Sequence, residues 1–148
     1  MAYEFKHQRR IEFYETDMAG IVHFSNYFRF MESAEQAFLR SLGFSVVMEH
    51  LDPPVGFPRV HAECDYKAPL RFEDVVEIHL LVREKRAKVV TCEFRFRNLS
   101  AEPVVEVARG VMTMVCVTRG PNGVMVSVPI PAQVAEKLEV APPELLAD

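Results

Sequence analysis

A carboxylate stands in a short glycine-containing segment directly ahead of the longest amphipathic helix pattern in the chain. The segment runs from Tyr14 to Tyr27 and contains Asp17 and Gly20. The start of a helix exposes backbone N–H groups that have no partner within the helix, and it carries partial positive charge. Such groups can polarise a carbonyl oxygen while a nearby carboxylate attacks the carbonyl carbon or activates water. Asp17 is therefore the first candidate for chemistry, and that chemistry would be acyl transfer.

The helix pattern behind this segment has recognisable ends. Ser25 and Asn26 are good N-cap residues, and Gly43 offers a C-cap. The apolar positions between them follow the i, i+3, i+4 spacing of a helix: Tyr27, Phe30, Met31, Ala34, Ala37, Phe38 and Leu42. We expect a helix of about four to five turns at 3.6 residues each. Glu32 and Glu35 fall on its polar face, where we expect a solvated or subunit-contact role.

Five other stretches are typical of strands, either because apolar and polar residues alternate with the period of a strand or because they form an apolar run bounded by turn residues. They are Tyr3–Phe13, Arg59–Tyr66, Val75–Glu84, Val89–Arg97 and Val104–Thr118. The last three connections between them are short, which favours antiparallel hairpins over helical crossovers. Phe44–Pro58 is rich in proline and reads as an irregular connection that could border a ligand. Pro129–Leu138 reads as a short helix opened by proline.

One long helix must then cover the whole sheet, so we expect the sheet to curl around it. Val104–Thr118 is apolar on both faces, and the face turned away from the helix needs cover of its own. A second subunit would supply that cover, so we expect at least a dimer.

Composition limits the class of protein. With 148 residues and 49% hydrophobic content, we expect one domain that spans residues 1–148. No run approaches the roughly 20 apolar residues of a bilayer span, and the first residues lack the apolar stretch of a secretory signal, so we expect a cytoplasmic protein with no membrane partner. Cys64, Cys92 and Cys116 lie far apart in expected strands and suit reduced, buried thiols. The histidines show no ligand spacing, so we predict no metal.

Charge argues against nucleic acid as a partner. The formal net charge is −4, from 17 basic and 21 acidic residues. Six of the basic residues nevertheless fall within the fifteen-residue stretch 83–97. Such a local cationic patch suits a small phosphorylated ligand.

From Tyr14 to Gly43 the chain resembles the signature of the 4-hydroxybenzoyl-CoA thioesterase group of hotdog-fold acyl-CoA thioesterases. The matching elements are Thr16-Asp17, Ala19-Gly20-Ile21-Val22, Asn26-Tyr27 and Phe30-Met31-Glu32. The expected order of strands fits that fold along most of the chain. The resemblance implies an α+β hotdog fold, in which a curved, mainly antiparallel five-stranded sheet wraps around one long central helix.

The resemblance also implies an activity, the hydrolysis of a coenzyme A thioester to a free acid and CoA without a cofactor. Asp17 would be the nucleophile or the general base, a choice that the sequence leaves open. The backbone N–H of Phe24 would polarise the thioester carbonyl. His23 is a candidate donor to the thioester oxygen or a partner that orients Asp17.

The substrate-binding residues implied in the same way form two groups. Gly20, Val22 and Tyr27 would line the acyl group, with Gly20 supplying an unhindered backbone or a positive φ. The turn Lys85-Arg86-Ala87-Lys88 is similar to a basic turn that binds the phosphates of coenzyme A in family members, with Ala87 where a second arginine can occur.

Two other functions remain open from the sequence. A hotdog hydratase or dehydratase would need a histidine paired with the acid, and His23 is the nearby candidate. A non-enzymatic acyl-CoA binding module would share the fold without the chemistry. In each case we expect an acyl-CoA partner and a homodimer or homotetramer with sites between subunits. The acyl group, and the choice between coenzyme A and acyl carrier protein, stay open.

Overall fold

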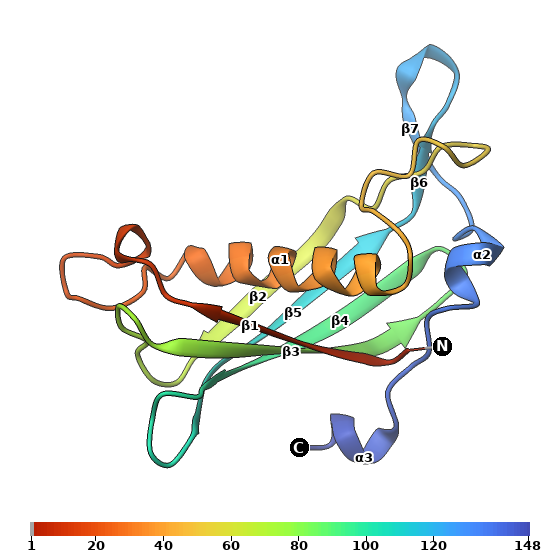
Figure 1. Cartoon of the computed structure of the whole chain (residues 1–148). Helices are drawn as coiled ribbons and strands as arrows, with labels where there is room; N and C mark the ends of the chain where they lie inside the picture. The colour runs from red at the N-terminus through yellow and green to blue at the C-terminus, as the bar shows by residue number, and fades with distance from the viewer. Residues whose placement is uncertain (1) are drawn as a thin grey trace.

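The computed structural model describes residues 2–148, and a five-stranded sheet forms its framework. The strands are β1 (Glu4–Arg10), β2 (Arg59–Tyr66), β3 (Val75–Lys85), β4 (Val89–Asn98) and β5 (Val105–Val115). They lie in the order β1-β3-β4-β5-β2, and each neighbouring pair is antiparallel. Figure 1 shows one long helix, α1 (Asn26–Ser41), running along one face of this twisted sheet. The architecture expected from the sequence is confirmed.

The core lies between α1 and the sheet because both present an apolar surface there. On the helix, the apolar positions that the periodicity singled out are mostly buried: Tyr27, Phe30, Met31, Ala34 and Phe38. On the sheet, alternate residues of the central strands meet them, among them Ile78, Leu80, Phe94 and Phe96, each 0% exposed. Burying one such side chain fully stabilises the fold by about 1.5–3 kcal/mol. This apolar contact between α1 and the central strands therefore fixes where the start of α1 lies over the sheet.

The expectation that Glu35 lies on the polar face of the helix in a solvated or subunit-contact role is wrong. Its side chain is buried, with 5% of the residue exposed, and its carboxylate accepts a 2.7 Å hydrogen bond from Nη2 of Arg59 on β2. Glu32 is exposed, as expected. Helical periodicity separates two faces of a helix, but it does not show that a strand far along the chain also reaches the polar face.

Several of the expected boundaries also differ, and the first strand, expected to reach Phe13, ends as β1 at Arg10. The stretch expected as Val104–Thr118 ends as β5 at Val115, and a hairpin of β6 (Val117–Arg119) and β7 (Met125–Ser127) follows it. Figure 1 shows this hairpin standing beyond the end of the sheet. Its tip is the short turn η2 (Pro121–Gly123), in which Asn122 and Gly123 have φ of 65° and 74°. The expected terminal helix is shorter, and α2 covers only Ala132–Ala135.

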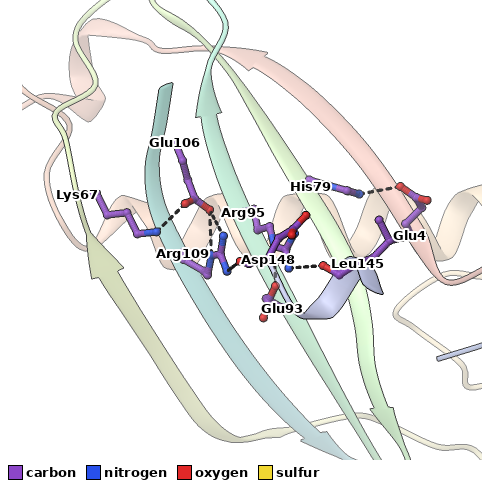
Figure 2. A network of polar contacts seen from close by, with 9 residues as sticks. All are labelled: Glu4, Lys67, His79, Glu93, Arg95, Glu106, Arg109, Leu145 and Asp148. Atoms are coloured by element: carbon purple, nitrogen blue, oxygen red, sulfur yellow. Dashed lines mark hydrogen bonds and ion pairs between the residues drawn. The ribbon is translucent and has the colours of Figure 1, made fainter. Parts of the chain in front are cut away.

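The outer face of the sheet, for which the sequence led us to expect a second subunit, is covered in part by the chain itself. That face carries the charged residues Glu93, Arg95 and Arg109 beside the apolar Leu81 and Val111, and the last segment of the chain, with α3 (Pro143–Leu146), lies across it (Figure 1). Figure 2 shows Nη2 of Arg95 donating to the carbonyl of Leu145 at 2.6 Å, and Nη1 of Arg109 donating to the carbonyl of Asp148 at 2.7 Å. The chain therefore covers part of this face itself, and β2 ends the sheet on one side with an edge that no other strand within residues 2–148 pairs.

Candidate active site

Asp17 lies in a loop between β1 and α1 that closes on itself. Thr16 and Val22 form an antiparallel bridge, and the Asp17 N–H donates to the carbonyl of Ile21 at 2.8 Å. The Gly20 N–H donates back to the Asp17 carbonyl at 3.0 Å. Gly20 has φ of 80°, a left-handed conformation that glycine adopts without steric cost. The glycine of this segment is therefore what allows the tight turn beside Asp17.

The carboxylate of Asp17 is oriented but not neutralised. Its Oδ1 accepts the Ala19 N–H at 2.8 Å and lies 3.5 Å from the Ile21 nitrogen. Hydrogen bonds from a side-chain oxygen to nearby backbone N–H groups fix the rotation of a short acidic side chain. Within residues 2–148, Oδ2 has no hydrogen-bond partner and no basic side chain pairs with Asp17. One oxygen is thus held by the loop, and the other is available.

Glu15 fastens the base of this loop to its surroundings. It is 6% exposed, and it accepts two hydrogen bonds from the guanidinium of Arg9 on β1, at 3.0 and 2.7 Å. The Glu15 carbonyl accepts the His23 N–H at 2.9 Å and Nδ2 of Asn26 at 2.8 Å. The Arg9 guanidinium also lies 4.2 Å from the centre of the Phe30 ring. The first strand and the helix start therefore hold the Asp17 loop from both sides.

The backbone N–H of Phe24 has no acceptor within the described part of the chain. Its neighbours do: the Ser25 N–H donates to Nδ1 of His23 at 3.3 Å, and the Asn26 N–H donates to the His23 carbonyl at 2.9 Å. The Phe24 carbonyl accepts a 2.9 Å hydrogen bond from the hydroxyl of Tyr66. The Phe24 N–H is therefore a free donor in an anchored turn, two residues ahead of the positive end of α1.

His23 lies apart from this arrangement. Its Nδ1 is 2.8 Å from Oγ of Ser25, and its ring stacks on Phe24 with centres 4.5 Å apart. It makes no hydrogen bond to Asp17 in the chain as described. His23 therefore shapes the turn before the helix through its ring and its backbone.

Asp17 lies where two open hollows meet. The first, of about 480 Å³, is lined by Asp17, Ile21, Val22, Phe24, Tyr27, Tyr66, Ala68 and Pro69. The second, of about 780 Å³, is lined by Asp17, Phe13, Tyr14, Thr16, Met18 and Gly20. We call them the inner hollow and the outer hollow. Asp17 is the one acidic group in either wall, and apolar side chains and aromatic rings make up most of the rest.

The two tyrosines of the inner hollow are neutral hydrogen-bonding groups. Tyr27 is 3% exposed, and its ring meets Tyr66 edge-on with centres 5.0 Å apart. Burial raises the pKa of Tyr66 to about 12 and holds the pKa of Tyr27 still further above its ordinary value. Neither hydroxyl ionises at neutral pH, so both tyrosines offer neutral hydrogen-bonding groups beside Asp17.

The basic turn lies at the other end of the sheet. The 11 residues of β3, at about 3.3 Å each, place the turn roughly 35 Å from the strand end that contacts the Asp17 loop. Nζ of Lys85 donates to the carbonyls of Ala135 and Leu138 at 3.0 and 2.8 Å, so this ammonium stabilises the end of α2. Arg86 and Lys88 are exposed. One chain alone does not bring this turn to Asp17.

Sequence reasoning missed the residues that hold the site together. Glu15, Arg9 and Tyr66 were not singled out, and Asn26 was read as a cap although its side chain bonds back to the Glu15 carbonyl. The available signal was Glu15 itself, an acidic residue two positions before Asp17 and shortly after the first expected strand. No metal site emerges either, because residues 2–148 contain no group of three or more His, Cys, Asp or Glu placed to hold an ion. Over the same residues, no helix combines the length and apolar character needed to cross a bilayer.

An antiparallel sheet curved around one helix, with an unpaired carboxylate beside the helix start, defines the class of hotdog-fold hydrolases. Residues 11–138 match the thioesterase-like superfamily, and the chain belongs to that family. The recognition made from the residues around Asp17 is thereby confirmed, and the chain is a thioester hydrolase.

Three known proteins illustrate the similarity. A putative esterase from Aquifex aeolicus (strain VF5) is 39% identical over 125 residues, which are 84% of this chain and 91% of the esterase. The structure of a gentisyl-coenzyme A thioesterase matches with a TM-score of 0.74 at 34% identity, over 88% of this chain and 99% of the other. The 4-hydroxybenzoyl CoA thioesterase from Pseudomonas sp. strain CBS-3 matches with a TM-score of 0.79 at 24% identity, over 92% and 99%. At that identity the last comparison shows the fold alone.

Proposed function

We propose that this chain hydrolyses an acyl-CoA thioester, with Asp17 as the catalytic carboxylate and the Phe24 N–H as the donor to the thioester oxygen. One observation carries the proposal. A carboxylate with one oxygen held by the loop and the other available lines the same apolar hollow as Phe24, whose backbone N–H has no acceptor among the described residues.

The chemistry follows from these two groups. The thioester oxygen gains negative charge as its carbon becomes tetrahedral, and a fixed backbone donor stabilises that charge; removing one such donor typically slows a reaction by about 10²–10³. Asp17 either attacks the carbon, giving a mixed anhydride that water then cleaves, or takes a proton from the water that attacks. Both routes expel the CoA thiolate, and both give the same acid and thiol.

The two hollows suit the two halves of such a substrate. The inner hollow presents Tyr27, Tyr66 and Phe24, whose rings favour a compact or aromatic acyl group. The gentisyl-coenzyme A thioesterase, at 34% identity, is named for such a thioester. The outer hollow is wider and more open, and it suits the pantetheine arm that leads away from Asp17.

A second copy of the chain would complete the site. β2 is an edge strand, and an antiparallel pairing with the β2 of another copy about a two-fold axis would set the Arg59 end of one beside the Tyr66 end of the other. The partner's basic turn lies at that same end, because the Lys88 carbonyl accepts the Cys116 N–H just beyond β5. Arg86 and Lys88 of the second copy would then approach the CoA phosphates.

Replacing Asp17 with Asn tests the function directly. The amide oxygen can still accept the Ala19 N–H, so the loop keeps its shape while the charge and the nucleophile are lost. We expect release of free thiol from acyl-CoA to fall by at least 100-fold, with substrate affinity changed by less than about threefold. Asp65→Asn, the same change at an exposed residue of β2 outside both hollows, is the matched control. Thiol release by Asp17→Asn within a few-fold of the unmodified chain would exclude Asp17 as the catalytic acid.

No observation favours the hydratase alternative. That chemistry needs a histidine paired with the acid, whereas His23 bonds to Ser25 and is not among the residues that line the inner hollow. Hydrolysis therefore remains the function that the site supports best.

A further inference from the structure

An apolar cavity under the second half of α1 has no part in the chemistry described above. Its volume is about 40 Å³, which holds roughly three methylene-sized groups. Phe38 and Leu39 of the helix and Val82, Val90 and Met114 of the sheet are among the side chains that line it. We call it the interior cavity. Apart from Glu35, the residues that line it have apolar side chains, so it suits hydrocarbon.

On the face of α1 that borders both spaces, one residue lies between the inner hollow and the interior cavity. Tyr27 lines the hollow, and Glu35 lines the cavity. Residues four apart on a helix lie one above the other on the same face, about 6 Å apart. Met31 is four residues from each, so it occupies the intervening turn of α1.

The strand register gives the same order independently. Along β2 and β5 the pairs run from Tyr66 with Ala108, through Cys64 with Gly110 and Ala62 with Met112, to Arg59 with Met114. Tyr66 belongs to the inner hollow and Met114 to the interior cavity. Gly110 and Met112 therefore lie between the two spaces on the sheet side, opposite Met31.

Met31 and Gly110 pack against each other between the two spaces. Met31 is 0% exposed, and a Cβ atom on residue 110 would lie 2.5 Å from its Cε and 2.7 Å from its Sδ. The absence of a side chain at Gly110 is thus what gives the thioether its place. Methionine is unbranched and has three rotatable side-chain bonds, so it fills a gap without making a rigid wall.

We propose that Met31 limits the length of the acyl chain that this enzyme accepts, by closing the passage between the inner hollow and the interior cavity. The proposal rests on the proposed function. Compact acyl groups end at Met31, and long straight chains have no room beyond it. Replacing Met31 with Ala removes three heavy atoms and opens the way to a cavity of about three more groups, so the site would admit acyl chains about six carbons longer.

The test compares kcat/KM for a series of straight-chain acyl-CoA thioesters of increasing length. Each methylene buried in an apolar space is worth about fourfold in binding, so filling the interior cavity is worth at most about 60-fold. We expect Met31→Ala to raise the ratio of long-chain to short-chain kcat/KM at least tenfold over the unmodified enzyme. Met31→Leu, which keeps a bulky side chain at this position, should leave the ratio within about threefold.

Met48→Ala controls for general loosening of the core. It makes the same change at a methionine that is 1% exposed but lines neither space. A ratio in Met31→Ala within twofold of the unmodified enzyme, or an equal rise in Met48→Ala, overturns the proposal. Should Met31→Ala fail to fold, Met112→Ala opens the same passage from the sheet side and is judged by the same criterion.

Failure of the proposed function would be seen separately. If the unmodified chain releases no thiol from any ester, the passage is tested by calorimetric binding of dodecyl-CoA, a thioether that cannot be hydrolysed. Binding by Met31→Ala at least tenfold tighter than by the unmodified chain supports the closed passage without reference to catalysis. Equal binding overturns it.

Discussion

Tyr66 links the sheet to the turn that presents the Phe24 N–H, and its removal should slow the reaction without weakening substrate binding. Its hydroxyl donates to the Phe24 carbonyl at 2.9 Å, while its ring forms part of the inner hollow. Because burial raises the pKa of Tyr66 to about 12, the hydroxyl remains a donor throughout the neutral range. Tyr66→Phe removes this one hydrogen bond and keeps the ring.

The magnitude follows from the value of one hydrogen bond. A bond between neutral groups contributes about 0.5–1.5 kcal/mol net, which corresponds to roughly twofold to tenfold in rate if the whole amount is lost in the transition state. We therefore expect kcat to fall by that factor, because the Phe24 N–H is less firmly positioned. The KM should change by less than about twofold, since the apolar wall is intact.

Steady-state thiol release measures both parameters. Tyr3→Phe removes a hydroxyl at the far end of β1, outside both hollows, and is the matched control. The reasoning is wrong if Tyr66→Phe leaves kcat unchanged, if the loss appears in KM, or if Tyr3→Phe has the same effect.

Two further predictions concern charge. Burial raises the pKa of the Glu35 carboxyl, and the nearby Arg59 opposes this rise only in part. The stability that Glu35 contributes is therefore fully present below the pKa of the group in the unfolded chain, and it is lost as pH rises through the pKa of the group in the folded protein. In urea unfolding, the free energy of unfolding of Glu35→Gln should therefore rise relative to that of the unmodified chain between mildly acidic and neutral pH, by about 1.4 kcal/mol for each unit by which the pKa is raised. A difference between the two proteins that does not change with pH would contradict this. Arg86→Ala and Lys88→Ala should raise the KM for acyl-CoA by about threefold to tenfold at low salt and less at high salt, with kcat unchanged. An acyl-pantetheine substrate, which lacks the nucleotide phosphates, should show no such rise, and an equal rise would refute phosphate binding by this turn.

Much of the fold could be predicted because periodicity is a local property of the sequence. The helix was expected to begin at Ser25 or Asn26, and α1 begins at Asn26. The hairpin after Val115 was missed, because its four-residue turn of Gly120 to Gly123 lies beyond an apolar run that reads as one strand.

The candidate site was predictable only in part. Asp17 was singled out from the local pattern, whereas the Phe24 N–H was expected only because the segment around it resembles a known family. The hydrogen bond from Tyr66 to Phe24 spans 42 residues and depends on which end of β2 meets the start of α1. Strand pattern alone does not give that register. For the same reason the sequence did not show that Arg86 and Lys88 lie at the far end of the sheet from Asp17.

The position of β2 has a consequence for how firmly the reaction centre is held. Only β5 flanks this strand, so its amides are bonded from one side and should open and exchange more readily than those of β4. Because the Tyr66 hydroxyl donates a hydrogen bond to the Phe24 carbonyl, motion of β2 would also move the turn that contains Phe24. A second copy paired along that free edge would therefore also make the turn at Phe24 more rigid, in addition to bringing its own basic turn toward the substrate.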